Sequence, residues 1–177
     1  MRAARSCARD ALRRFAETLR LPVATTYHAR GVFPDDHAQV LGAVGLVRRD
    51  DVNFGFDEAD VIVIVGYELQ EFDPVRFNPD GDKQIVHLRR SPAEVDAHYN
   101  VTVGVQADVS STLDALAAAA PGRLRPAATG EQICMLLATE LACGDGHRLA
   151  PLPPQRIVAD TRRVLRPSDI ALADSAR

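Results

Sequence analysis

The chain has 177 residues, of which 46% are hydrophobic and 25% charged, and its formal net charge is −3. This length suits one globular domain of ordinary core size and leaves little room for a second complete one. The longest apolar runs are too short to cross a bilayer, and the acidic balance argues against a surface that holds nucleic acid, so we expect neither membrane nor nucleic acid as a partner.

The cysteines and the arginine-rich start of the chain bear on its compartment. The three cysteines are widely spaced and form no Cys-x-x-Cys pair, which argues against a disulfide framework and a structural zinc site. The first 20 residues hold six arginines, so a transit peptide is the alternative to a structural helix. One apolar face favours the structural helix; it comprises Ala8, Ala11, Leu12, Phe15 and Leu19. The cysteine pattern favours a cytoplasmic protein.

Helical and extended patterns alternate through the first two thirds of the chain, which is typical of a parallel sheet covered by helices. A helix is predicted at residues 3–20 and a strand at 23–25, followed by a long loop through Gly31, Pro34 and Gly42. The next predicted elements are a short helix at 52–58, strands at 60–66, 84–88 and 101–106, and a helix capped by Asp108 or Ser111.

The pattern changes after residue 120, where proline and glycine interrupt regular structure. A helix is predicted near residues 131–142, and a last helix that Pro167 stops is followed by a strand at 170–173. We therefore divide the chain into a domain at 1–120, a linker with one helix at 121–153, and the start of a further domain at 154–177.

Several ordered blocks of sequence carry a family resemblance. They are LPVATTYHARGVFPDDH, LGAVGL, FDEADVIVIVGYELQEFDPVRFNPDGDKQIVHL, PAEVDAHY and ADVSSTL. Together they resemble the central domain of thiamine-diphosphate-dependent enzymes of the acetolactate synthase group, and GYELQEFDP looks closest to the catabolic, flavin-independent type. The segment PPQRIVADTRRVLRPSDIALAD is similar to the start of the C-terminal, diphosphate-binding domain of that family, where it breaks off.

The resemblance implies a three-layer α/β fold with a doubly wound, mainly parallel, Rossmann-like sheet. The family usually enters this domain through a buried strand and a glycine turn, whereas Met1 here stands almost at the start of the predicted helix. We therefore expect the sheet to lack its first strand. The family also commonly has Ile-Asp after the histidine that corresponds to His87, but this chain has Leu88 and Arg89. That change removes the usual acceptor for a ribose hydroxyl.

Candidate cofactor-binding residues lie at or near predicted strand ends, where open α/β sheets place ligands. They match blocks that contact flavin or ADP in nucleotide-binding members of the family, and no G-x-G-x-x-G motif accompanies them. These candidates are Thr25, Thr26, Gly42, Gly45, Gly66, Tyr67 and Asp108. Structural glycines and caps are the competing interpretation, so FAD or ADP is a possible cofactor but not the expected one.

No catalytic or metal-binding residue is expected in this chain. The GDG triplet at Gly144 resembles the start of the family's metal-diphosphate site, but the paired asparagines that complete that site are absent. A helix-ending turn is the better interpretation of the triplet. The glutamate that activates thiamine belongs to another domain of the family, and Glu68, Glu71 and Glu131 have no matching context.

The resemblance implies that a complete relative, with thiamine diphosphate and Mg²⁺, decarboxylates pyruvate and joins the two-carbon unit to another 2-oxo acid. Alone, this chain is expected to be inactive and to act as a scaffold and oligomerisation region. Its expected partners are the other domains or subunits of such an enzyme, in a homo-oligomer. An autonomous FAD or adenine-nucleotide binding module and a truncated gene product without independent function are the alternatives.

Overall fold

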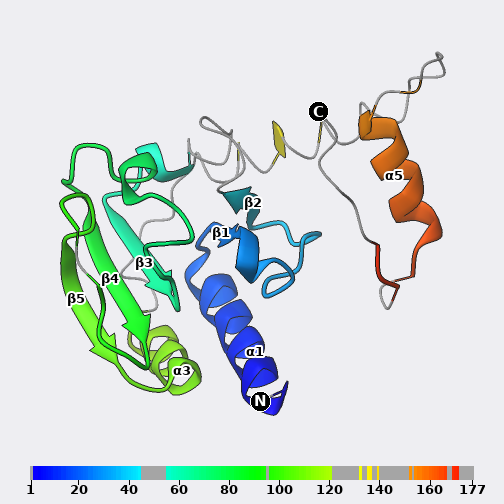
Figure 1. Cartoon of the computed structure of the whole chain (residues 1–177). Helices are drawn as coiled ribbons and strands as arrows, with labels where there is room; N and C mark the ends of the chain where they lie inside the picture. Colours follow the sequence, from blue (N-terminus) through cyan, green and yellow to red (C-terminus); the bar gives the residue numbers. More distant parts are fainter. Residues whose placement is uncertain are drawn as a thin grey trace. The chain divides into compact units, whose positions relative to one another are not determined.

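The computed structural model describes residues 2–44, 55–94, 96–120, 154–166 and 169–171, with the separate residues 132, 135, 136, 139 and 152 (Figure 1). The chain divides into two compact units, Met1–Cys134 and Met135–Arg177. This boundary falls inside the predicted linker at 121–153, and the division into three parts stays a prediction. None of the described helices is long and apolar enough to cross a membrane.

The first unit contains parallel strands with α-helices before and after them, and 3-10 turns and loops connect the strands. In chain order its elements are α1 (Arg2–Leu19), β1 (Val23–Thr26), the 3-10 turn η1 (Tyr27–Ala29), β2 (Val40–Val44), β3 (Val61–Val65), the 3-10 turn η2 (Pro74–Arg76), β4 (Gln84–Arg89), β5 (Val101–Gln106) and α3 (Val109–Ala119). Of the predicted short helix at 52–58, residues 55–57 are helical and 52–54 lie outside the described residues.

Strand β2 corrects the prediction of one long loop after β1. Four of its five residues VLGAV pair in parallel with β1, and the register shifts between Val23 and Ala24. Gly42 lies inside β2 with a φ of +115°, a conformation that glycine adopts without strain. The sequence pattern did not predict this strand, because its apolar run is short and Gly42 interrupts it.

The described strands form two sheets. One sheet has the order β1-β2 and the other the order β3-β4-β5, and every pair is parallel. Among the described strands, β1 and β3 each have a hydrogen-bonded neighbour on one side only. Parallel strands flanked by the helices α1 and α3 confirm the α/β class.

One face of β3-β4-β5 is covered by α1 and α3. Three buried α1 residues, Ala11, Phe15 and Leu19, follow each other at intervals of four and therefore share a helix face. They form the core with Leu88 of β4 and Leu113 of α3. At the rim, Arg14 forms two-pronged hydrogen bonds to the Asp114 carboxylate, the shorter of them 2.9 Å long, which joins the two helices.

Loops cover the opposite face of this sheet and provide the third layer. His87 of β4 points to that face, because its neighbour Leu88 belongs to the helix-covered core. Tyr67, Phe77 and Tyr99 lie within 5.4 to 6.2 Å of one another, measured between ring centroids. All three rings are buried, so aromatic packing replaces a helix on this side.

The second unit contains α5 (Pro154–Val164), as predicted. Its apolar residues Ile157, Val158 and Val164 are exposed. Residues 135, 136 and 139 of this unit and residue 132 of the first unit are helical, within the helix predicted at 131–142. Of the strand predicted at 170–173, residues 170 and 171 are neither helix nor strand, and 172 and 173 lie outside the described residues.

Candidate functional site

The candidate site is built on the loop that follows β3. Gly66 ends the strand with a φ of +70°, and its N–H donates to the Leu88 carbonyl at 2.9 Å. The chain can therefore turn sharply while staying attached to β4. The Tyr67 hydroxyl then donates to the Phe72 carbonyl, which folds the loop back on itself. Burial raises the pKa of Tyr67 well above its usual value, so this hydroxyl stays protonated at neutral pH.

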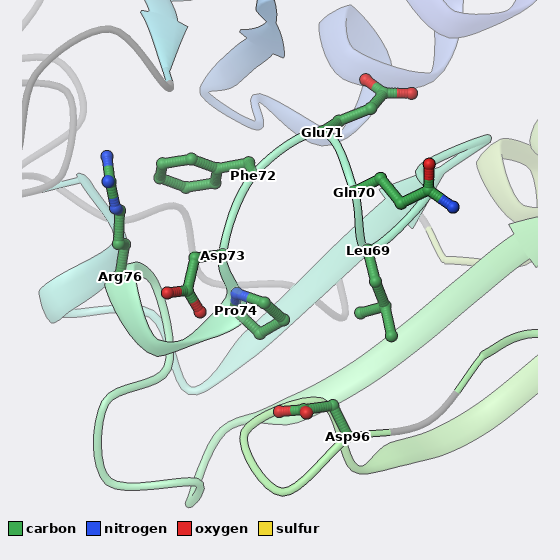
Figure 2. A pocket seen from close by; sticks show the side chains of 8 residues that line it. All are labelled: Leu69, Gln70, Glu71, Phe72, Asp73, Pro74, Arg76 and Asp96. Atoms are coloured by element: carbon green, nitrogen blue, oxygen red, sulfur yellow. The ribbon is translucent and has the colours of Figure 1, made fainter.

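This loop surrounds a pocket of about 390 Å³. Figure 2 shows the backbone of residues 69–76 curving around the pocket, with Asp96 contributed by the turn between β4 and β5. The lining residues are Leu69, Gln70, Glu71, Phe72, Asp73, Pro74, Arg76 and Asp96. Three carboxylates and one guanidinium give the lining a net negative formal charge, which does not suit a phosphate or diphosphate group.

The carboxylates of the pocket serve local structure. Asp73 caps the turn η2 by accepting from the Val75 N–H at 3.1 Å, and Asp96 accepts from the His98 N–H at 3.0 Å. Glu71 accepts from the Thr26 hydroxyl. Among the described residues, no group of three His, Cys, Asp or Glu side chains could hold a metal ion.

The structure brings some of the predicted cofactor-binding residues together and separates others. Thr26 at the end of β1 meets the loop that begins with Gly66 and Tyr67, because Glu71 of that loop binds its hydroxyl. Thr25 is buried within β1, and its exposed fraction is 7%. Gly42 is part of β2, and Gly45 lies outside the described residues.

Asp108, the remaining predicted residue, caps a helix and forms an ion pair. Its carboxylate accepts from the Ser111 N–H at 3.2 Å, which makes Asp108 and not Ser111 the cap of α3. The Arg90 guanidinium binds the same carboxylate. The hydrogen bond from Arg90 holds the pKa of Asp108 below its usual value, and the hydrogen bond from the Ser111 backbone adds a smaller effect in the same direction. Each carboxylate oxygen of Asp108 therefore has a protein partner, and these contacts indicate a structural role and not a ligand site.

The arginine that replaces the family's acid is also paired. Arg89, at the end of β4, donates to the Glu68 carboxylate in the loop after β3 at 2.5 Å. Together with Arg90 and Asp108, this pair links the carboxyl ends of β3, β4 and β5. Two guanidinium groups thus stand at the sheet edge where a ribose hydroxyl needs an acceptor.

A buried polar pair is the feature that sequence reasoning missed. His87 and Tyr99 are 2% and 1% exposed, and the Tyr99 hydroxyl lies in hydrogen-bond contact with His87 Nδ1. Burial lowers the pKa of His87 and raises that of Tyr99, so both side chains are neutral at pH 7. No spacing pattern in the sequence pointed to Tyr99 or to its contact with His87.

We expect FAD to bind weakly or not at all to the purified chain. The two arginine pairs remove the acceptors that a ribose would use, and the pocket lining repels a diphosphate. Titration followed by flavin fluorescence should show no saturation at low micromolar FAD. A tight complex with one FAD per chain would contradict this prediction and would favour an autonomous nucleotide-binding module.

Comparison with known proteins gives one family. Residues 1–116 match the family described as thiamine pyrophosphate enzyme, central domain. The acetolactate synthase of Bacillus subtilis is 32% identical over 115 residues, which cover 64% of this chain and 20% of that protein. A probable acetolactate synthase large subunit of Methanocaldococcus jannaschii is 30% identical over 175 residues, which cover 96% of this chain and 29% of that protein. The chain thus spans less than a third of the length of these curated relatives.

Proposed function

Because the chain belongs to the family of thiamine pyrophosphate enzyme central domains, we propose that it is the central, scaffolding region of an acetolactate synthase-like enzyme. The family match over residues 1–116 is the observation that carries this proposal, and the similarity to acetolactate synthases supports the choice of enzyme. The complete enzyme would decarboxylate pyruvate and join the two-carbon unit to a second 2-oxo acid. An autonomous nucleotide-binding module is not favoured.

The described residues of this chain do not fit thiamine diphosphate or Mg²⁺. The pocket after β3 carries a net negative formal charge, and the part of the chain that the structure describes contains no cluster of metal-binding side chains. The GDG triplet at Gly144 lies outside the described residues. We therefore assign both groups to the other domains of the proposed enzyme and derive no catalytic step from this chain.

The proposed role is mechanical support. Helices α1 and α3 cover one face of the sheet with a common apolar core, and ion pairs join the ends of three adjacent strands. Such a domain presents a fixed surface against which cofactor-binding domains or subunits can pack. Assembly as a homo-oligomer in the cytoplasm, without nucleic acid or membrane, is part of the proposal.

The purified chain is expected to form no acetolactate from pyruvate, even with thiamine diphosphate and Mg²⁺ added. It lacks both the activating glutamate and the paired asparagines that the family uses. A colorimetric acetoin assay checks this, with the Bacillus subtilis acetolactate synthase as the positive control. Turnover that survives repurification and disappears in Asp145→Ala would contradict the assignment of the chemistry to other domains.

A domain replacement tests the scaffold role directly. Residues 2–116 are expected to support acetolactate formation when they replace the matching segment of the Bacillus subtilis acetolactate synthase, since the two share the family's fold over this region. The control is the same replacement with Leu113→Asp, which places a charge in the core and should abolish activity. A hybrid that folds and assembles like the host enzyme but makes no acetolactate would overturn the proposed role.

A further inference from the structure

The inference concerns a second cavity, which lies beside His87 on the loop-covered face of β3-β4-β5. Its volume is about 130 Å³, and residues of β4, of β5 and of the segment directly after β4 surround it. Those that carry the argument are His87, Ser91, Pro92, Ala93, Gly104 and Gln106. None of them lines the pocket after β3 or belongs to the arginine pairs at the sheet edge, so this cavity is separate from the candidate site.

The register of β4 against β5 leaves room for the cavity. Gly104 lies directly opposite His87 in this parallel pair, so both positions are on the same face of the sheet. A Cβ atom placed on Gly104 would have one neighbour within contact distance, Val101 Cγ1 at 3.7 Å. The space beside the imidazole ring is therefore open because the residue opposite His87 is a glycine.

His87 borders the cavity with one paired and one unpaired ring nitrogen. Its Nδ1 contacts the Tyr99 hydroxyl, whereas its buried Nε2 has no hydrogen-bond partner among the described residues. Tyr99 is not part of the cavity lining, so the cavity meets the ring away from the paired nitrogen. Because a buried polar atom without a partner is costly, Nε2 is the atom to which a ligand would add the missing hydrogen bond.

The contact with Tyr99 determines which ring nitrogen carries the proton. If the Tyr99 hydroxyl donates to Nδ1, neutral His87 carries its proton on Nε2, and that N–H is the one unpaired group. In the opposite arrangement, both Nε2 and the hydroxyl hydrogen of Tyr99 are buried without a partner among the described residues. One unsatisfied group costs less than two, so His87 presents an N–H donor to the cavity.

We propose that this cavity binds a small uncharged carbonyl compound, such as a primary amide, whose oxygen accepts a hydrogen bond from His87 Nε2. The lining has no formal charge, so a carboxylate or an ammonium group would lose its hydration without gaining an opposite charge. Ser91 and Gln106 add uncharged polar side chains that can pair with the amide nitrogen. The volume equals about four water molecules, which limits the ligand to roughly four to six non-hydrogen atoms. The proposal does not depend on the proposed enzymatic role.

NMR spectroscopy of the full chain tests the proposal, with acetamide as the probe and acetate as its control. The two probes share one shape and differ in charge. Spectra of the histidine ring nitrogens should show the His87 proton on Nε2. Acetamide should shift the signals of this N–H and of the Gly104 amide saturably, with a dissociation constant on the order of 1 mM, which is within reach of so small a ligand. Acetate should cause no saturable shift.

Gly104→Val fills the cavity without altering His87, and Val103→Thr is the matched control on the opposite face of β5. The backbone of Gly104 does not have a positive φ, and valine suits a strand, so the first variant should keep its thermal midpoint. It should weaken acetamide binding about tenfold or more. Val103 is 49% exposed, and its change to threonine should leave the affinity unaltered.

Several results would overturn the proposal. They are a His87 proton on Nδ1, equal binding of acetamide and acetate, and unchanged acetamide affinity in a folded Gly104→Val variant. A His87 Nε2–H that contacts an ordered water and does not respond to acetamide would do the same. If Gly104→Val does not fold, the comparison of acetamide with acetate decides alone, because it uses the unmodified chain.

Discussion

Replacement of Leu113 by alanine is expected to lower the free energy of unfolding by about 2 to 5 kcal/mol. The Leu113 side chain is fully buried and lies in the core shared by α1, α3 and β4. Phe15 and Leu88 are fixed on a helix and a strand, so they cannot close the cavity that the substitution leaves. Because a domain of this size is stabilised by about 5 to 15 kcal/mol in total, the loss should be large in urea denaturation.

Leu152→Ala is the matched control for this measurement. It makes the same chemical change at a leucine whose exposed fraction is 54%, so it should shift the urea midpoint little. Similar shifts for Leu113→Ala and Leu152→Ala would contradict the assignment of Leu113 to the core.

Acidification from pH 7.5 to 5.5 is expected to destabilise the domain through His87. Burial lowers the pKa of this imidazole below its ordinary value of 6.5, and the nearby Arg89 shifts it in the same direction. The unfolded chain therefore takes up a proton at His87 more readily than the folded one. The stability that neutral His87 provides is fully present above pH 6.5 and is lost as the pH falls toward the lowered pKa.

Thermal midpoints measured across this pH range check the prediction. The midpoint of the unmodified chain should fall with pH, whereas that of His87→Phe should be lower at pH 7.5 but depend less on pH. His28→Gln is the control, since the side chain of His28 is 75% exposed and its change should leave the slope unaltered. A His87→Phe slope equal to that of the unmodified chain would show that other groups cause the acid sensitivity.

The sequence was informative where structure follows from local rules. The run VIVIV predicts a buried parallel strand and forms β3, and a single Asp108 side chain begins α3 as a cap. Strand β2 was missed because Gly42 interrupts a short apolar segment. A strand can be predicted from sequence when several successive residues are β-branched and apolar, as in β3, and not when a glycine interrupts them, as in β2.

The candidate site was less predictable because its contacts cross between loops. Nothing in the spacing of Tyr67 and Tyr99 shows that their rings pack together, since loops have no period that would place side chains on one face. The pairing of Arg89 with Glu68 depends on the register of β3 against β4. The loss of the ribose acceptor could be predicted, but the partner that now holds the arginine could not.

The joint between α1 and α3 has a consequence for synthesis of the protein on the ribosome. Arg14 and Asp114, which join the two helices, are 100 residues apart in the chain. At about 5 to 20 residues per second, α1 emerges roughly 5 to 20 seconds before α3. During that interval its apolar face, with Phe15 and Leu19, has no α3 to cover it. The nascent chain is thus a candidate client for chaperones until the last helix of the domain has been translated.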